Sequence, residues 1–395
     1  MRKIKVYQDG NTDQKRNDTE LNEKINIEID ALNSIEQIKH KWNYIYSNAE
    51  ENFFLSWNWI NPWLRSTLNN FNAYVCVATI NNKPIGIAIF TEVMSSRYKI
   101  LSTKQWWLHK TGNEKHDQIW IEQNDFLLDK RYASLTRAAM WSAILEQKPN
   151  IDEFIIGMSN HETIQAHQLC LPEYLKWDFI ESTGWSAEVE NWPDFESYWK
   201  SRSKSFRNQI NKTDKILTAQ KANISINTDN ITFQEGLKIA GPWHKNHWGT
   251  ESGFENDLFI KHLTSMSNMS DEKSKSNLFT LSIQLDNAPI AVCLGFYTST
   301  TLYFYLSAQE KIKDNKIKIG LYLHYLAIKW CFQNKVKCYD FLAGDYRYKR
   351  SFADKPTYFY LSHFQRNTFK FKIENQLKLL KSKIAHHFRA NSSQV

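Results

Sequence analysis

Two stretches of the chain follow the same order of residue types, and this internal duplication restricts the fold more than any other feature. Residues 74–90 read YVCVATINNKPIGIAIF and residues 279–296 read FTLSIQLDNAPIAVCLGF, so the two copies start 205 residues apart. Each copy has an apolar run, a polar pair, one further residue, Pro-Ile and a second apolar run. Asn or Asp in the turn and proline at the start of the return strand favour a β-hairpin. We therefore predict two equivalent hairpins in two repeats of one unit.

A helix and a further strand follow each hairpin. The apolar face of residues 135–145 predicts a helix before a strand at 153–156, and residues 321–332 stand in the same relation to a strand at 339–343. Two parallel strands joined by a helix require a right-handed crossover, and helices then cover the sheet. We predict an α/β fold with mixed sheets in two tandem lobes. No Pro/Gly/Ser-rich linker separates the repeats, so we expect the lobes to pack around a shared cleft.

The chain divides into four segments on this basis. Residues 1–51 are an N-terminal extension with a strand near 25–29 and a helix near 35–46, and the first lobe covers 52–185. It opens with an aromatic block, residues 53–63, which we expect to be the buried start of a helix. The second lobe covers 186–366, and residues 367–395 form a basic amphipathic helix.

Scarce glycine excludes two common nucleotide-binding designs. The 395 residues include only 12 glycines, and neither G-x-G-x-x-G nor G-x-x-x-x-G-K occurs. Rossmann turns and P-loops need such clusters because backbone N–H groups must approach phosphate closely. The five cysteines are odd in number and never spaced as C-x-x-C. We therefore expect no metal site and a reducing, cytoplasmic location, and the N-terminus lacks the apolar segment of a secretory signal.

The net charge of +8 is concentrated in two segments. Residues 200–221 and residues 366–395 each hold seven bases and one acid, which leaves the rest of the chain slightly acidic. Focal basicity suggests anionic contacts more than a uniformly cationic surface. Within the second segment a stripe of apolar residues predicts an amphipathic helix: Ile373, Leu377, Leu380, Ile384 and Phe388. That helix could pack on its own domain, lie on an anionic membrane or contact RNA.

One helix entry has the features of a phosphate site. Gly320 begins the second apolar helix after a loop with four lysines: Lys311, Lys313, Lys316 and Lys318. The first N–H groups of a helix are free, and the helix dipole places partial positive charge there. The alternative is a solvated basic loop with a convenient glycine. The same stretch of the first repeat has no glycine and two acids, so a phosphorylated ligand is expected only in the second lobe.

The residues after the last apolar strand carry a resemblance. Residues 340–349 read DFLAGDYRYK. The pattern D-F-x-x-G-x-x-x-Y-K after an apolar helix resembles the C-terminal signature of the CelD-like acyltransferases of the GNAT superfamily. These are linked to cellulose and exopolysaccharide synthesis and are related to the Fem-type aminoacyl transferases of peptidoglycan. Further stretches resemble the same family over about residues 50–366, namely 54–63, 120–128, 203–210, 243–248 and 319–321.

The resemblance implies two GNAT-like lobes with an acyl donor bound at the second and a degenerate donor site in the first. The expected co-substrate is acetyl-CoA or another acyl-CoA, held by Lys316, Lys318, Gly320 and Leu321. Lys318-Ile319 stands where the family often has Ser-Pro. An amine attacks the donor directly, so a base must accept its proton and donors must stabilise the oxyanion. Catalytic candidates are His247, Asp340, Tyr348 and Lys349, and acceptor-binding candidates are Lys204, Arg207, His244 and Trp248.

Three functions remain open at this stage. The first is an N-acyltransferase that acts on an amine of a sugar or cell-envelope precursor. The second is a Fem-type transferase that uses aminoacyl-tRNA, for which the basic segments would supply a tRNA contact. The third is a non-catalytic scaffold of a polysaccharide-synthesis machine, in which the C-terminal helix makes a peripheral contact with the inner membrane. Asp340 and Tyr348 could also be purely structural, and a histidine flanked by tryptophans is often simply packed.

Overall fold

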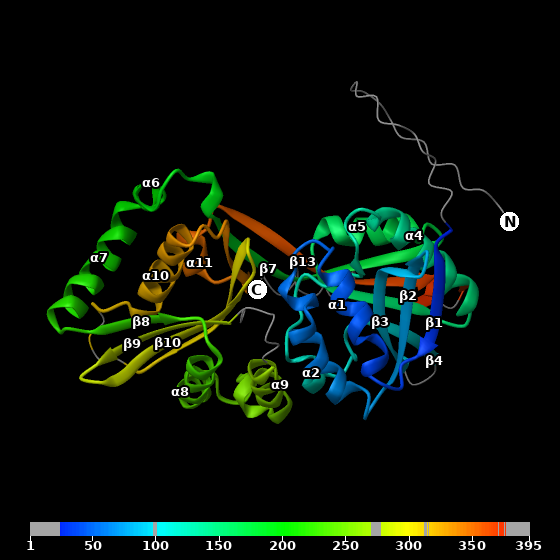
Figure 1. The fold of residues 1–395 in the computed structure, drawn as a ribbon, viewed down its shortest axis with the longest axis horizontal. Coiled ribbons are helices and arrows are strands. Elements are labelled where there is room, and N and C mark those ends of the chain that lie inside the picture. The colour runs from blue at the N-terminus through cyan, green and yellow to red at the C-terminus, as the bar shows by residue number, and fades with distance from the viewer. Residues whose placement is uncertain are drawn as a thin grey trace, which may run out of the picture.

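The structure is a computed structural model that describes residues 24–97, 101–269, 278–311, 314, 316–369, 371–374 and 376. Two α/β lobes lie side by side along the long axis of the molecule, and two long strands, β7 and β13, run from one lobe to the other (Figure 1). Neither strand was among the predicted elements, so their position is the main feature that the tertiary structure adds.

The first lobe consists of a curved sheet with helices on both faces. Its elements are β1 (Asn26–Ala31), α1 (Glu36–Tyr46), η1 (Phe53–Leu55), α2 (Trp57–Thr67), β2 (Asn72–Ile80), β3 (Lys83–Arg97), β4 (Leu101–Leu108), α3 (Glu114–Asp117), β5 (Leu127–Leu128), α4 (Ala133–Gln147), β6 (Glu153–Ser159) and α5 (His161–Cys170). β1 and α1 confirm the strand and helix expected in the N-terminal extension, whose residues 1–23 lie outside the described part of the chain.

The second lobe follows the connecting strand β7 (Tyr174–Glu188). Its elements are η2 (Val189–Asn191), α6 (Phe195–Ser201), α7 (Lys204–Ala219), β8 (Asn223–Asn227), α8 (Asn230–Trp248), η3 (Gly249–Glu251), η4 (Gly253–Glu255), α9 (Asp257–Asn268), β9 (Leu278–Leu285), β10 (Ala288–Tyr297), β11 (Thr301–Gln309), α10 (Ile319–Gln333), β12 (Cys338–Ala343), α11 (Arg347–Phe352) and β13 (Lys355–Arg366). None of the described helices combines the length and the apolar content that a membrane crossing requires.

Both predicted hairpins are confirmed, with the same turn geometry. Asn81 and Asn82 join β2 to β3 with φ of 49° and 63°, and Asp286 and Asn287 join β9 to β10 with the same two values. Two consecutive residues with positive φ make the turn type whose twist matches paired strands, and Asn and Asp tolerate it best among residues with a Cβ. The polar pair in each copy of the motif therefore supplies the positive φ angles that the hairpin turn requires.

The strands form one mixed sheet in the order β1-β2-β3-β4-β6-β13-β7-β12-β11-β10-β9-β8. The parallel pairs β4–β6 and β11–β12 confirm the crossover expected in each repeat. β13 lies between β6 and β7, and β7 also pairs with β12. Each lobe is thus completed beside a strand of the other repeat. The boundary predicted between residues 185 and 186 falls inside β7, and the division into segments stays a prediction.

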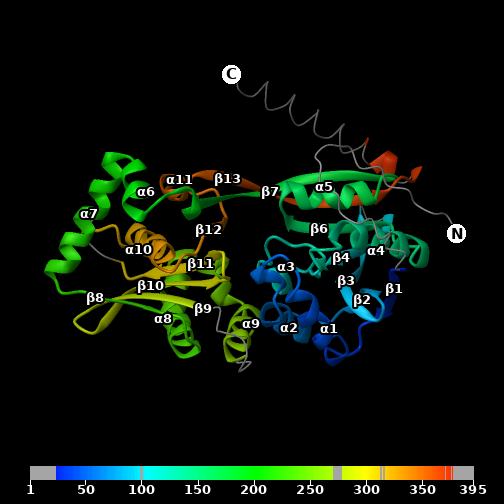
Figure 2. The same cartoon turned by 45° about the horizontal axis from the view of Figure 1, so that its top comes forward.

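Aromatic side chains bury the contact between the lobes. Phe53 stacks on Phe296 of the second lobe with ring centroids 4.4 Å apart and an angle of 5° between the rings. Trp59 meets the same ring edge-on at 5.4 Å, and all three side chains are almost fully buried. Figure 2 shows α2 beside α9, in agreement with the contacts between these helices. The aromatic block is a buried helix start, as predicted, in a core that both lobes share.

Side-chain caps fix where most helices near this contact begin. Ser56 accepts from the backbone N–H of Trp59 at the start of α2, and Asp229 accepts from that of Thr232 at the start of α8. Such caps satisfy N–H groups that have no partner inside the helix. α10 differs, because its N-cap residue Lys318 makes no side-chain cap. Of the predicted C-terminal helix, residues 369, 371–374 and 376 are described as helical, and residues 377–395 lie outside the described part.

Candidate functional site

The two central strands of the second lobe separate where the site lies. β11 and β12 pair in parallel only from Thr301–Cys338 to Tyr303–Asp340. The register of β11 with β10 shifts just beyond this point, between Phe304 and Leu306, which is a β-bulge. Bulges bend a strand and redirect its side chains, and they occur often beside active sites. The edge of β11 after Tyr303 therefore turns away from β12 and leaves a gap between the two strands.

A hollow of about 560 Å³, called here the first hollow, lies at the start of α10. Its lining includes Trp243, His247, Gln309, Lys318, Gly320 and Tyr348. The uncapped first turn of α10 faces this hollow. Gly320 keeps the space in front of that turn open, because a Cβ at this position would project into it and lie 3.1 Å from Oε1 of Gln309. Free N–H groups, the helix dipole and the nearby ammonium of Lys318 make this end of the hollow suitable for an anion.

A second hollow of about 460 Å³, the central hollow, lies in the gap between β11 and β12. Residues 304–307 and 341–344 line it from the second lobe, and Trp120, Ile121 and Glu122 line it from the first. It shares five lining residues with the first hollow: His244, Trp248, Ser307, Tyr346 and Tyr348. The two hollows therefore adjoin, and this is the shared cleft that the repeated sequence predicted.

The two histidines at the end of α8 are not equivalent. His247 is exposed, packs against Trp248 at 4.9 Å and lines only the first hollow. His244 lines both hollows, and its Nδ1 lies 2.8 Å from Oγ of Ser252. Burial, with a smaller contribution from His247, lowers the pKa of His244 to about 4. His244 is therefore neutral near pH 7 and lies closer to the meeting point of the hollows than His247, which the sequence analysis preferred.

The ammonium of Lys349 holds the end of β12 in place. Its Nζ donates to the main-chain carbonyls of Phe341 at 2.8 Å, Leu342 at 3.2 Å and Ala343 at 2.6 Å, and the side chain is only 2% exposed. Leu342 has a φ of 56°, so the strand bends where these carbonyls converge. Burial lowers the pKa of Lys349 to about 8, against the nearby negative charges of Glu122, Asp340 and Asp345.

Asp340 lies on β12 but does not line either hollow. Its carboxylate accepts from the backbone N–H of Leu342 at 2.7 Å and from Nε2 of Gln123 at 2.9 Å. Burial raises the pKa of Asp340 to about 6 despite these bonds. The contacts make Asp340 a joint between β12 and the first lobe, which is the structural alternative that the sequence left open.

Tyr348 lies between the two hollows and contributes to the lining of both. Its ring stacks on His324 of α10 with centroids 5.0 Å apart. Burial raises the pKa of the Tyr348 phenol, so its hydroxyl keeps its proton at neutral pH. A protonated hydroxyl at the junction can donate to an atom that gains negative charge there.

The predicted binding residues fall into two groups. Lys318, Gly320, Leu321, His244 and Trp248 line the first hollow. Lys316 is exposed and does not line either hollow, and Lys204 and Arg207 lie on α7, also outside both hollows. α7 still flanks the start of α10, because the backbone N–H of Lys318 donates to Oγ1 of Thr213 at 2.9 Å. Among the described residues, no group of three or more His, Cys, Asp or Glu side chains is placed to hold a metal.

The first-lobe residues of the central hollow were not among the predicted site residues. Glu122 accepts from the backbone N–H of Ala343 at 2.9 Å, and the Tyr305 hydroxyl donates to the carbonyl of Ile119 at 3.1 Å. Trp120 and Gln123 have positive φ, so the loop that carries them turns sharply between the lobes. These contacts join residues more than 180 positions apart, and no local pattern could have indicated them.

The corresponding gap in the first lobe is filled by the chain itself. β4 and β6 pair in parallel over Gln105–Trp107 and Glu153–Ile155. Nδ2 of Asn124 then donates to the carbonyls of Leu108 at 2.7 Å and Gly157 at 2.9 Å. Oδ1 of Asn124 lies 2.9 Å from Nδ1 of His109, which is fully buried. One amide thus bridges the two strands where the second lobe has its central hollow.

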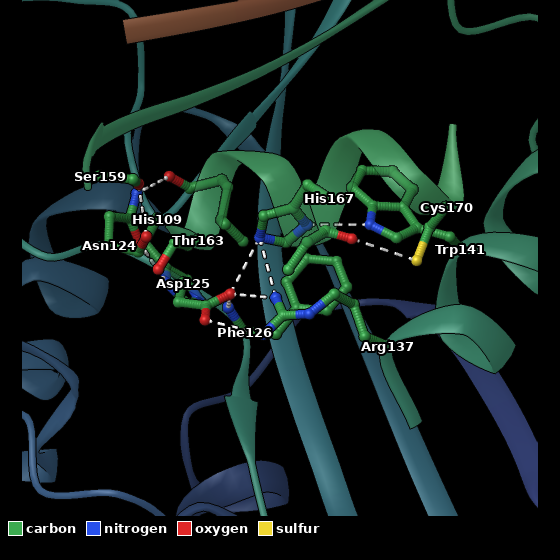
Figure 3. A network of polar contacts seen from close by, with 12 residues as sticks. His109, Asn124, Asp125, Phe126, Arg137, Trp141, Ser159, Thr163, His167 and Cys170 are labelled. Carbon is green, nitrogen blue, oxygen red and sulfur yellow. Dashed lines mark hydrogen bonds and ion pairs between the residues drawn. The ribbon is translucent and has the colours of Figure 1, made fainter. Parts of the chain in front are cut away.

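A partly buried ion pair follows Asn124 in the chain and holds this segment in place (Figure 3). Asp125 pairs with both Nη atoms of Arg137 on α4 and lies 2.9 Å from Nε2 of His167 on α5. Burial alone would raise the pKa of Asp125, but Arg137 and His167 outweigh it and hold that pKa below its usual range. The filled gap supports the prediction that a phosphorylated donor binds only to the second lobe.

Comparison with known proteins gives one match to a family model. Residues 204–350 match the family model described as an acetyltransferase (GNAT) domain. This match lies within the second lobe. The matched range holds β11, α10, β12 and most of α11, so it covers both hollows on the second-lobe side. No curated protein matches the chain in sequence.

Solved structures extend the similarity of fold to both lobes. FemX shares 8% identity over 84% of this chain and 96% of its own, with a TM-score of 0.55. A conserved protein of unknown function from Bacteroides thetaiotaomicron shares 12% identity over 86% of this chain and all of its own, with a TM-score of 0.52. At such identities the similarity shows the fold alone. The mixed α/β fold is as predicted, and these structures share it over both lobes.

Proposed function

We propose that the protein is an N-acyltransferase that transfers an acyl group from acyl-CoA to an amine of a sugar or cell-envelope precursor. The observation that carries the proposal is the uncapped start of α10, with Lys318 and Gly320, at the mouth of a hollow that continues into the gap between β11 and β12. A pyrophosphate fits the helix start, and the acyl end of the donor then reaches the gap. The GNAT domain of the second lobe supports acyl transfer as the reaction class.

The central hollow offers the groups that this reaction needs. The amine attacks the thioester carbonyl carbon, and main-chain N–H groups along the open edge of β11 are available to the oxyanion. The carbon–sulfur bond then breaks, and Tyr348 can donate its proton to the leaving thiolate. The proton of the amine passes to a base, for which we propose His244 because it lines both hollows. Lys349 is a positioning residue, because its ammonium holds the end of β12 in place.

Donor binding is tested by thermal shift with CoA and with acetyl-CoA. We expect both to raise the melting temperature of the unaltered protein, and Gly320→Glu to remove the effect by placing a carboxylate among the phosphates. His161→Glu is the matched control, because it adds the same charge at the start of α5 in the first lobe. Absence of a shift in the unaltered protein would refute the donor assignment. Intact-mass analysis of candidate amines after incubation with acetyl-CoA then tests transfer.

Aminoacyl-tRNA is the second candidate donor. The exposed face of α7 carries Lys204, Lys212 and Lys215 and flanks the start of α10, so a larger polyanion could also contact it. A salt series separates the two donors. CoA offers few phosphates, whereas tRNA binding that involves many phosphates falls steeply with salt concentration. A shallow slope for tRNA together with tight CoA binding would favour acyl-CoA.

The finer family and cellular context are also proposals. The D-F-x-x-G-x-x-x-Y-K pattern supports a place among CelD-like proteins and a role in exopolysaccharide synthesis in the cytoplasm. A scaffold function predicts neither CoA binding nor turnover. Co-sedimentation with anionic liposomes, with and without residues 367–395, tests the proposed membrane contact of the C-terminal segment.

A further inference from the structure

A third hollow, called here the outer groove, continues the path from the central hollow toward solvent. It has a volume of about 980 Å³ and lies between the lobes, where η3 and the start of α9 face α3 and the end of β4. It shares four lining residues with the central hollow: Lys110, Asp117, Trp120 and Glu251. The three hollows therefore adjoin one another in series, from the start of α10 to the cleft between the lobes.

The two ends of this path differ in charge. The outer groove is lined by five acids and two bases: Glu114, Asp117, Glu251, Glu255 and Asp257 against Lys110 and Lys115. The first hollow has one acid, Asp314, together with Lys318 and the helix start. A cleft lined by one sign of charge raises the local concentration of ligands of the opposite sign. An anionic donor therefore enters at α10, and the opposite end favours a cation.

Three of the groove carboxylates are available to a ligand. Asp117 already accepts from the backbone N–H groups of Thr111 and Gly112, and Glu255 pairs with Lys245 at 3.4 Å. The other three are exposed, and no hydrogen bond or ion pair joins them to a residue that the structure describes: Glu114, Glu251 and Asp257. They come from α3, η3 and α9, so they lie on both sides of the cleft.

Indole rings accompany these carboxylates. Trp107 and Trp120 line the outer groove, and Trp248 lines the central hollow. Trp120 and Trp248 are each 42% exposed, although Trp120 is held by Phe259 at 5.5 Å. Fixed, exposed indole faces bind flat apolar surfaces and also attract ammonium groups. The outer groove alone reaches the upper end of the about 300–1,000 Å³ typical of sites for drug-sized ligands, so it offers more room than a single small amine requires.

We infer that the acceptor is an oligosaccharide of amino sugars with free amines, bound along the outer groove with one amine in the central hollow. The inference rests on the proposed acyl transfer and names its substrate class. Sugar rings lie on the indole faces, and ammonium groups along the chain lie near Glu114, Glu251 and Asp257. The amine that reaches the central hollow loses its proton, attacks the acyl carbon and becomes an amide, while the thiol leaves. An acceptor rich in phosphate is disfavoured, because the groove carries more acids than bases.

Isothermal titration calorimetry with glucosamine tetramer tests the inference. The fully N-acetylated tetramer is the uncharged control. We expect the amine form to bind, the acetylated form to bind at least tenfold more weakly, and salt to weaken only the former. Glu251→Gln and Asp257→Asn should each weaken binding about threefold to fivefold, as expected for exposed charge pairs. Glu235→Gln is the control, because it removes the same charge from an exposed site on α8 outside the three hollows.

Several results would overturn the acceptor class. Equal affinity for the two tetramers would show that the free amines are not recognised. Tighter binding of spermidine than of the amine tetramer would show that the acceptor is a linear polyamine and not a sugar. Equal loss in Glu235→Gln and Glu251→Gln would show that only overall charge matters. A separate measurement of CoA binding distinguishes failure of the acceptor inference from failure of the proposed acyl-CoA donor. If CoA binds and the amine tetramer does not, the acceptor inference fails alone, whereas tetramer binding without CoA binding would refute the proposed donor.

Discussion

Replacing Gly320 with alanine should separate donor binding from folding. Gly320 is the second residue of α10 and lines the first hollow. A Cβ at this position would lie 3.1 Å from Oε1 of Gln309, which is the far end of a flexible side chain. The side chain can move by the few tenths of an ångström required. The backbone needs no adjustment, because Gly320 is not among the glycines with positive φ.

The expected change in stability is small. Alanine favours a helix over glycine by about 0.5–1 kcal/mol, and the displaced Gln309 offsets part of this gain. The free energy of unfolding should therefore stay within about 1 kcal/mol of the original value, which corresponds to a few degrees in melting temperature.

The expected change in donor affinity is much larger. The new methyl group occupies the space in which a phosphate would approach the first N–H groups of α10. A hydrogen bond to a charged group contributes about 1.5–3 kcal/mol, so losing one weakens the Kd for CoA about 10-fold to 100-fold. Calorimetric titration with CoA measures this loss, and thermal unfolding without ligand measures stability.

A double variant provides the control for crowding. Gly320→Ala with Gln309→Ala relieves the contact with Gln309 but keeps the methyl group in the hollow, so donor affinity should stay low. Unchanged CoA affinity in Gly320→Ala would refute a phosphate at this helix start. Recovery of affinity in the double variant would instead show that the Gln309 side chain, and not the helix start, is what the donor requires.

Three further outcomes follow from the buried charges and the filled gap. Burial raises the pKa of Asp340 to about 6, whereas an aspartate in the unfolded chain has a pKa of about 3.9, so the stability that protonated Asp340 contributes is lost as pH rises from about 4 through 6. Asp340→Asn should therefore stabilise the fold by ~1–3 kcal/mol at pH 7 and by much less at pH 4, as measured by urea unfolding. A gain that does not depend on pH would contradict this sign. Arg137→Met leaves the partly buried Asp125 without its guanidinium partner, although His167 remains. It should destabilise the fold by ~1–3 kcal/mol while CoA affinity is kept, as measured by urea unfolding and titration. Since Asn124 fills the gap between β4 and β6, calorimetry should give one CoA per chain, and a stoichiometry of two would show that the first lobe also binds donor.

Much of the fold was predictable because its signals are local. The turn pairs Asn81-Asn82 and Asp286-Asn287 fix both hairpins through their backbone preferences. The aromatic block was also predictable as buried, since rings of that size rarely stay in water. The donor side of the site was accessible for the same reason, because Gly320 and its lysines are neighbours in the chain.

The acceptor side was predictable only in part. His244 and Trp248, which were expected to bind the acceptor, line the central hollow. Lys204 and Arg207 were expected to bind the acceptor, but they lie outside both hollows, and that role stays a proposal. Glu251, Trp120 and Glu122 line the central hollow as well, and none of them was predicted. They come from segments that are adjacent only after the lobes pack, so their combined charge is invisible in any window of sequence.

By itself the sequence determined the repeat, the hairpins, the crossover helices and the one glycine at a helix entry. Each depends on hydrogen bonds and side-chain periodicity within a few turns of chain. The tertiary structure alone decided that β7 and β13 run between the lobes and that Asn124 fills one of two equivalent gaps. It also decided that the cleft has an uncapped helix start at one end and an excess of acids at the other. These features depend on which distant surfaces bury each other, and no local pattern in the sequence records that.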